Sequence, residues 1–220
     1  MDNKIFKRVT KKESKSVRKF VQNLLDEIHD GLKEFYRFDL RLVGSAAWNT
    51  IIKDNDNWWD LDYQILLTKK SKEYKLNELS KATDIKNTFF NYVNEKYKDN
   101  ATYTVQNSTT ALTIINNDSK WSVDIVIIKV LPENNLIIRR NNKDGSGKNE
   151  FTWNELKKRN EAYDKFNKLS NEEKMDLIEN HILPRKYDEK QKSEDDETKL
   201  SSCQVFVEEV NNYVNGKENN

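Results

Sequence analysis

The sequence predicts an α/β (α+β) protein with a mixed central sheet flanked by helices and a short helical part at the C-terminal end. Two observations predict this class. Up to about residue 140, segments with the spacing of an amphipathic helix alternate with β-rich runs. Beyond Gly147 the composition turns helical. We therefore expect a core over residues 14–140 and a helical region over residues 150–215, packed on that core.

Composition sets further bounds. Charged side chains make up 34% and apolar side chains 35% of the 220 residues, and the net charge is only +1. This balance gives no overall field that would attract a nucleic acid. The single cysteine, Cys203, excludes an intramolecular disulfide and fits a reducing compartment. Neither a signal peptide nor a run of about 18 apolar residues is visible. We expect a cytoplasmic protein with no membrane partner.

The first predicted element is a long helix. Residues 1–13 are basic, and we expect them to be frayed. From Lys15 to about Phe35, apolar residues recur in steps of three and four, which predicts an amphipathic helix. These apolar positions are Val17, Phe20, Val21, Leu24, Leu25, Ile28, Leu32 and Phe35.

Two strands are predicted next, on either side of a turn. The first covers residues 38–43 and ends at Gly44. Ser45 is then expected to cap a short helix, and residues 54–59 form an acidic, Asn-rich loop. The second strand covers residues 60–68. Its continuous Ile-Leu-Leu run predicts burial on both faces.

The rest of the core is a helix followed by β-rich runs. Apolar spacing predicts the helix over residues 75–97. The β-rich runs cover residues 102–106, 111–116, 121–130 and 136–139. Residues 141–149, with two glycines, read as the loop that ends the core.

Three helices are predicted beyond that loop. The first two cover residues 153–169 and 172–182, and Ser170 with Glu173 forms a candidate capping box before the second. Pro184 is expected to interrupt the helical pattern. The last predicted helix covers residues 200–214.

Two carboxylates open the second predicted strand. Side chains alternate along a strand, so Asp60 and Asp62 project from the same face. Carboxylates this close repel each other unless a positive charge lies between them. A hard divalent cation with oxygen ligands is the usual solution. By itself the pair also fits two solvent-facing acids at the start of a strand.

A Gly-Ser turn precedes these acids. Gly44 and Ser45 offer backbone N–H groups and a hydroxyl just before the predicted short helix, which suits a phosphate. Ser45 also fits a simple N-cap role, and the two roles are compatible.

A third carboxylate lies further along the chain. Asp124 is the only charged residue between Lys120 and Lys129, in a strongly β-forming run. A lone carboxylate in an apolar strand is costly unless it is paired or bound to a metal. If this strand lies beside the Asp60–Asp62 strand, all three carboxylates converge on one or two Mg²⁺ ions.

This ordered set resembles a known superfamily. Gly44-Ser45, a following helix, Asp60-x-Asp62 on a strand and Asp124 on a later strand resemble the DNA polymerase beta-like nucleotidyltransferases. The motifs are most similar to the branch that contains cyclic GMP–AMP synthase, oligoadenylate synthase and their bacterial relatives. The resemblance covers roughly residues 16–130. It departs from the family in the longer 54–59 loop and the short part after Gly147.

The resemblance implies a role for each residue. Gly44 and Ser45 would hold the phosphates of a nucleoside triphosphate. Asp60, Asp62 and Asp124 would be the catalytic and metal-binding residues, with Mg²⁺, or Mn²⁺ in its place, as the cofactor. The reaction would move a nucleoside monophosphate to a hydroxyl acceptor and release pyrophosphate. Residues 157–159 are basic candidates for phosphate neutralisation, and Tyr163 is a candidate for stacking on a base.

The sequence leaves alternatives open. The acceptor would be a second nucleotide, an RNA end, a small molecule or a protein side chain. The unusual 54–59 loop and the short C-terminal part also fit a catalytically inactive domain of this fold that binds nucleotide or a protein partner. In a third arrangement, the fold is kept but Asp124 lies far from Asp60 and Asp62.

Overall fold

The chain folds into two compact units in a computed structural model, which describes residues 7–53, 56–67, 81–140, 150–156, 160–193 and 195–218. The sheet unit contains residues 11–43 and 58–156. The helical unit contains residues 1–10, 44–57 and 157–220. Both are built from discontinuous segments. The division into domains at 14–140 and 150–215 remains a prediction.

The sheet unit is a mixed sheet, in which the described residues form seven strands in the order β2-β4-β7-β6-β5, with β8 beside β7 and β9 beside β8. β4 and β7 are parallel, and the other pairs are antiparallel. The strands are β2 (Phe38–Val43), β4 (Trp59–Leu67), β5 (Tyr103–Asn107), β6 (Ala111–Asn116), β7 (Trp121–Lys129), β8 (Leu136–Arg140) and β9 (Phe151–Glu155).

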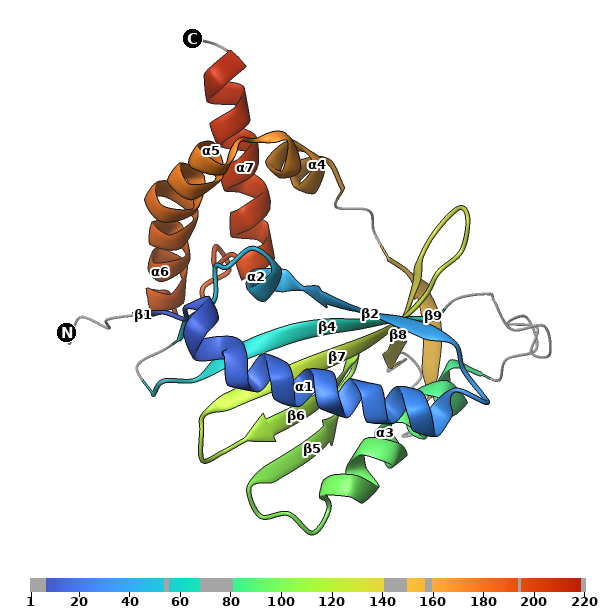
Figure 1. Cartoon of the computed structure of the whole chain (residues 1–220). Coiled ribbons are helices and arrows are strands. Elements are labelled where there is room, and N and C mark those ends of the chain that lie inside the picture. Colours follow the sequence, from blue (N-terminus) through green and yellow to red (C-terminus); the bar gives the residue numbers. More distant parts are fainter. Residues whose placement is uncertain are drawn as a thin grey trace. The chain divides into compact units, whose positions relative to one another are not determined.

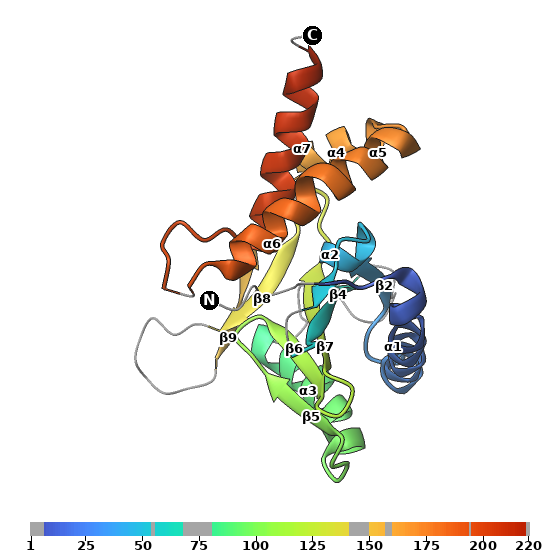
Figure 2. The ribbon, with the colours of Figure 1, turned by 90° about the vertical axis from the view of Figure 1, so that its left-hand side faces the viewer.

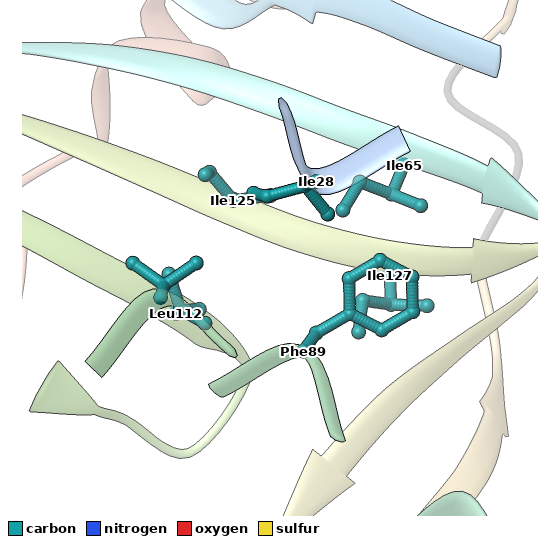
Figure 3. A pocket seen from close by; sticks show the side chains of 7 residues that line it. Ile28, Ile65, Phe89, Leu112, Ile125 and Ile127 are labelled. Atoms are coloured by element: carbon teal, nitrogen blue, oxygen red, sulfur yellow. The ribbon is translucent and has the colours of Figure 1, made fainter. Parts of the chain in front are cut away.

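Two helices, α1 (Lys11–Leu32) and α3 (Ala82–Tyr97), cover one face of this sheet (Figures 1 and 2). Their apolar stripes face the odd-numbered residues of β4 and β7, which are buried except at Trp59 and Lys129. Figure 3 shows side chains from both helices and from β4, β6 and β7 converging around a cavity of about 10 Å³. The lining residues are Ile28, Ile65, Phe89, Val93, Leu112, Ile125 and Ile127.

The opposite face of β4 and β7 is only half-covered. Burial alternates strictly along β4, and Leu66 is half-buried where its two neighbours are buried. The prediction that the Ile65-Leu66-Leu67 run is buried on both faces is therefore wrong for the described residues. The sheet has helices on one face and a more open face that carries the even-numbered residues, including the predicted acids.

The longer helices of the helical unit, together with a π-helical turn, pack around their own apolar core (Figure 2). The helices are α4 (Asn160–Lys168), α5 (Asn171–Leu177), η1 (Ile178–Ile182), α6 (Leu183–Gln191) and α7 (Ser202–Glu218). The buried core contains Ile52, Ala162, Phe166, Leu177, Ile178, Ile182, Leu183, Phe206 and Val210. The predicted capping box of Ser170 and Glu173 is present at α5.

Short elements complete the helical unit. β1 (Lys7–Arg8) pairs with β3 (Ile52–Lys53), and α2 (Gly44–Ala47) is a single turn. Residues 7 and 8 are therefore in a strand and not frayed, and the long helix begins at Lys11. Gly44 is the first residue of α2 with φ of 62°, a value that glycine adopts without strain. Ser45 consequently lies inside the turn and does not precede it as an N-cap.

Two predicted boundaries are corrected. Trp153 lies in β9 and not in a helix, because residues 151–155 pair with β8 across the sheet edge. Pro184 does not interrupt the chain's helical course: α5, η1 and α6 follow each other directly, and Pro184 lies in the first turn of α6. The wider π-turn accommodates a residue that lacks an N–H donor.

Some predicted elements extend outside the described residues, including residues 75–80 of the predicted helix and the loop at 141–149. Across the part of the chain that the structure describes, no helix combines the length and the apolar character needed to cross a bilayer.

Candidate functional site

Asp62 and Asp124 are direct neighbours across the sheet. They are register partners on the parallel strands β4 and β7, and Asp60 is the partner of Ser122 two residues away. Adjacent strands lie about 4.8 Å apart. The arrangement in which Asp124 lies far from the other two acids is therefore not the one observed.

All three carboxylates occupy the open face of the sheet unit. Their odd-numbered neighbours, such as Leu61 and Val123, are completely buried beneath the helices. Asp62 and Asp124 are half-buried and Asp60 is exposed. The period of two along each strand thus produces one acidic row at the amino ends of β4 and β7.

Asp124 has the most perturbed environment of the three. Burial raises the pKa of its carboxyl, and the negative charge of Asp60 raises that pKa further. The hydroxyl of Thr113 on β6 donates to Asp124 Oδ1 at 2.6 Å and lowers the pKa. The buried ammonium of Lys86 acts in the same direction.

The fit of this row to a metal ion has two parts. Carboxylate oxygens on one face of two adjacent strands are the donor type that Mg²⁺ prefers. However, no group of three or more His, Cys, Asp or Glu among the described residues stands close enough to hold a metal as the side chains lie. The donor chemistry and the backbone register therefore fit a divalent cation, although the acids as they lie do not form a closed ligand set.

Ser45, which the sequence predicts to bind phosphate, has a hydrogen-bond partner that the sequence did not reveal. In the helical unit, Lys186 on α6 is buried, and its Nζ donates to Ser45 Oγ at 2.9 Å. The same ammonium donates to the carbonyl of Thr50 at 2.5 Å. A fixed cation beside the serine suits an anionic ligand.

A polar cavity of about 140 Å³ adjoins Lys186 within the helical unit. Three lysines and two serines are among its lining residues. It is lined by Lys186, Glu189, Lys190, Lys199, Leu200, Ser201, Ser202 and Val205. The backbone N–H of Leu200 donates to Glu189 at 2.8 Å, and this bond holds the pKa of the Glu189 carboxyl below its usual range.

Tyr163 stacks on Trp48 with ring centroids 5.5 Å apart and packs against Phe206, as part of the aromatic side of the helical core. Residues 157–159 lie outside the described residues, as does part of the 54–59 loop. Gly44 follows Val43 in the chain, and Val43 is the register partner of Asp62.

A phase argument could have found Lys186. It lies three residues after Leu183 and three before Glu189, and all three side chains are buried on one side of α6. A lysine in phase with a buried leucine is unusual unless its charge is satisfied. The prediction that Pro184 breaks the helix hid this phase.

No protein-family model matches the chain, and no curated protein matches it. Solved structures are similar to it. The GTP-bound form of DncV from Vibrio cholerae has a TM-score of 0.60 at 10% identity, over 80% of this chain and 45% of that chain. The same synthase with the linear intermediate 5′ pppA(3′,5′)pG has a TM-score of 0.57 at 12% identity, over 80% and 47%. DncV from Escherichia coli, with 3′-deoxy GTP, has a TM-score of 0.50 at 13% identity, over 82% and 47%.

The chain thus spans about half the length of these structures. The Vibrio cholerae protein is a cyclic AMP–GMP synthase, and such synthases belong to the group that the motif resemblance indicated. At this identity the likeness shows the fold, and it confirms the predicted fold class: the chain has the nucleotidyltransferase fold.

Proposed function

We propose that this protein is a nucleotidyltransferase that moves a nucleoside monophosphate from a nucleoside triphosphate to a hydroxyl acceptor. The observation that carries the proposal is the register pairing of Asp62 with Asp124, with Asp60 on the same face. Similar structures that bind GTP or contain a linear dinucleotide intermediate support the use of nucleoside triphosphates. We place the protein in the cytoplasm, in line with its single cysteine.

The three acids would hold Mg²⁺, or Mn²⁺ in its place. Bound there, such ions would stabilise the negative charge that develops on the reacting phosphoryl group. Asp124 is suited to receive the acceptor's hydroxyl proton, because burial and Asp60 both raise the pKa of its carboxyl. The new bond joins the acceptor oxygen to the α-phosphorus. The bond from that phosphorus to the bridging oxygen breaks, and pyrophosphate leaves.

Gly44, Ser45 and Lys186 would bind the triphosphate. The hydroxyl oxygen of Ser45 already accepts a hydrogen bond from Lys186, so its own proton is available to a phosphate oxygen. The ammonium of Lys186 supplies a positive charge that is buried and therefore weakly screened. The adjoining cavity is lined by further lysines and serines, whose ammonium and hydroxyl groups can donate hydrogen bonds to phosphate oxygens.

The acceptor is the open part of the proposal. A second nucleotide is the first class to test, because one similar structure contains a linear dinucleotide intermediate. An RNA end, a small molecule and a protein side chain are the other classes.

The test incubates the protein with each α-labelled nucleoside triphosphate, Mg²⁺ or Mn²⁺, and each acceptor class. Asp62→Asn and Asp124→Asn are expected to lower product formation by at least about a hundredfold, because each removes a charge that holds the cation. Asp39→Asn is the matched control, since Asp39 is an exposed acid on β2 of the same sheet. Full activity in Asp62→Asn would contradict the proposal.

The inactive alternative predicts a different result. Triphosphate would bind in calorimetry, but no acceptor class would give labelled product. Binding without turnover in the wild-type protein would therefore replace the transferase assignment with that of a nucleotide-binding domain.

A further inference from the structure

Thr113 is the side chain that fixes Asp124 in the sheet unit. It lies on β6 directly opposite Asp124 on β7, so Asp62, Asp124 and Thr113 form one transverse row across three strands. The hydroxyl of Thr113 donates to Asp124 Oδ1 at 2.6 Å. This is the length of a strong hydrogen bond between a hydroxyl and a carboxylate.

This hydrogen bond gives the two carboxylate oxygens of Asp124 different roles. Oδ1 is occupied on the β6 side by the hydroxyl. The other oxygen remains for a ligand above the open face, where Asp62 lies on the β4 side. A carboxylate that is held at one oxygen loses its freedom to rotate about χ2, which broadly varies in an unrestrained aspartate.

The position does not require a hydroxyl for folding. Valine has nearly the same shape as threonine and is at least as favourable in a strand. Thr113 is half-buried in the middle of β6, between Leu112 and the fully buried Ile114. The hydroxyl is therefore best explained by the carboxylate that it contacts.

We propose that Thr113 is a positioning residue for the transfer reaction, holding Asp124 in the rotamer that presents its second oxygen to the cation and the acceptor hydroxyl. The inference rests on the proposed function of the acidic row. It assigns no contact between Thr113 and the substrate. Partners that orient metal-binding carboxylates typically contribute tenfold to a hundredfold in metal affinity or activity.

The test compares Thr113→Val, which removes the donor, with Thr113→Ser, which keeps it. Thr104→Val is the matched control, because Thr104 lies on the adjacent strand β5 and its hydroxyl accepts from Asn117 rather than contacting an acid. Three quantities are measured on the whole chain: the kcat and KM of transfer, the Mn²⁺ affinity by electron paramagnetic resonance, and the ¹³Cγ chemical shift of Asp124 without metal.

Thr113→Val is expected to lower kcat about tenfold with little change in the KM for nucleoside triphosphate, to weaken Mn²⁺ binding, and to move the Asp124 resonance. Thr113→Ser should restore all three, and Thr104→Val should match the wild type. A Thr113→Val protein with wild-type kcat and Mn²⁺ affinity would overturn the proposal.

The readouts separate this inference from the proposed function. If the wild type transfers nucleotides but Thr113→Val does so equally well, only the positioning role fails. If the wild type neither transfers nucleotides nor binds Mn²⁺, the proposed function fails, and the role of Thr113 in it is overturned even where the Asp124 resonance still moves.

Discussion

Lys186 Nζ lies 2.9 Å from Ser45 Oγ, although 141 residues separate the two in the chain. The same nitrogen lies 2.5 Å from the carbonyl oxygen of Thr50, which is itself buried. One ammonium thus ties both ends of the turn that follows Gly44 to α6. This relationship connects the fold of the helical unit to its candidate phosphate site.

Replacing Lys186 with methionine should weaken both folding and ligand binding. The carbonyl of Thr50 would lose a buried donor, which costs about 1–3 kcal/mol of unfolding free energy. The KM for nucleoside triphosphate should rise at least about tenfold, because a desolvated phosphate contact is lost. Denaturant unfolding and steady-state kinetics measure the two effects.

Lys168→Met provides the control for this change, since Lys168 is exposed near the end of α4. Its stability and KM should equal those of the wild type. If Lys186→Met lowered stability but left the KM unchanged, Lys186 would be a structural residue alone.

Glu189 should stabilise the backbone at Leu200, which borders the polar cavity. It is buried on α6, it accepts the N–H of Leu200 at 2.8 Å, and the ammonium of Lys192 donates to it at 2.9 Å. These bonds hold the pKa of its carboxyl below the usual range. The stabilisation is present above pH 4.5 and is lost as the pH falls through the lowered pKa.

Glu189→Gln is expected to speed amide hydrogen exchange at Leu200 at neutral pH, because a charged acceptor becomes a neutral one. Asp188→Asn, at the exposed neighbouring position, should leave that exchange unchanged. Equal exchange rates in Glu189→Gln and wild type would show that the Leu200 contact does not depend on the charge.

The acidic row shows which part of the candidate site could be predicted from the sequence. The period of two placed Asp60 and Asp62 on one face, and the lone charge at Asp124 indicated a special strand. Whether β7 lies beside β4 depended on pairing between segments about sixty residues apart, which no local pattern specifies. The sheet register supplied that step.

Errors arose where tertiary packing overrides local signals. Leu66 belongs to an apolar run but lies on the half-open face, because alternation is set by which face the helices cover. Trp153 fits a helical spacing and yet pairs in β9, since an edge was available on β8. Lys186 was missed because lysine is normally solvated, and its buried partners come from the distant Ser45–Thr50 turn.

The cavity of about 10 Å³ in the sheet unit predicts that the core accepts one more methyl group (Figure 3). Val93 lines it and is fully buried. Val93→Ile should raise the unfolding free energy by about 0.5–1 kcal/mol, whereas Val93→Ala should lower it by about 2–3 kcal/mol. Denaturant midpoints with unchanged m-values measure both. A lower midpoint for Val93→Ile would show that the site is already full.

Lys86 should make the free energy of unfolding of the sheet unit vary with pH in the alkaline range. Its side chain is fully buried on α3 and donates to the carbonyl of Thr110 at 2.8 Å. Burial, and then the charge of Arg140, lower the pKa of Lys86 from 10.5 to about 8. Between these two values the unfolded chain keeps the proton that the folded chain has released, so stability rises with pH across this window.

Comparison with Lys86→Met isolates this effect, because other titrating groups cancel in the difference. The unfolding free energy of the wild type minus that of Lys86→Met should increase by on the order of 2–3 kcal/mol as the pH rises from 8 to 10.5. The lost bond to Thr110 adds a constant that does not vary with pH. Urea unfolding at half-unit pH steps measures the slope, and a flat difference would mean that Lys86 stays charged in the folded protein throughout the window.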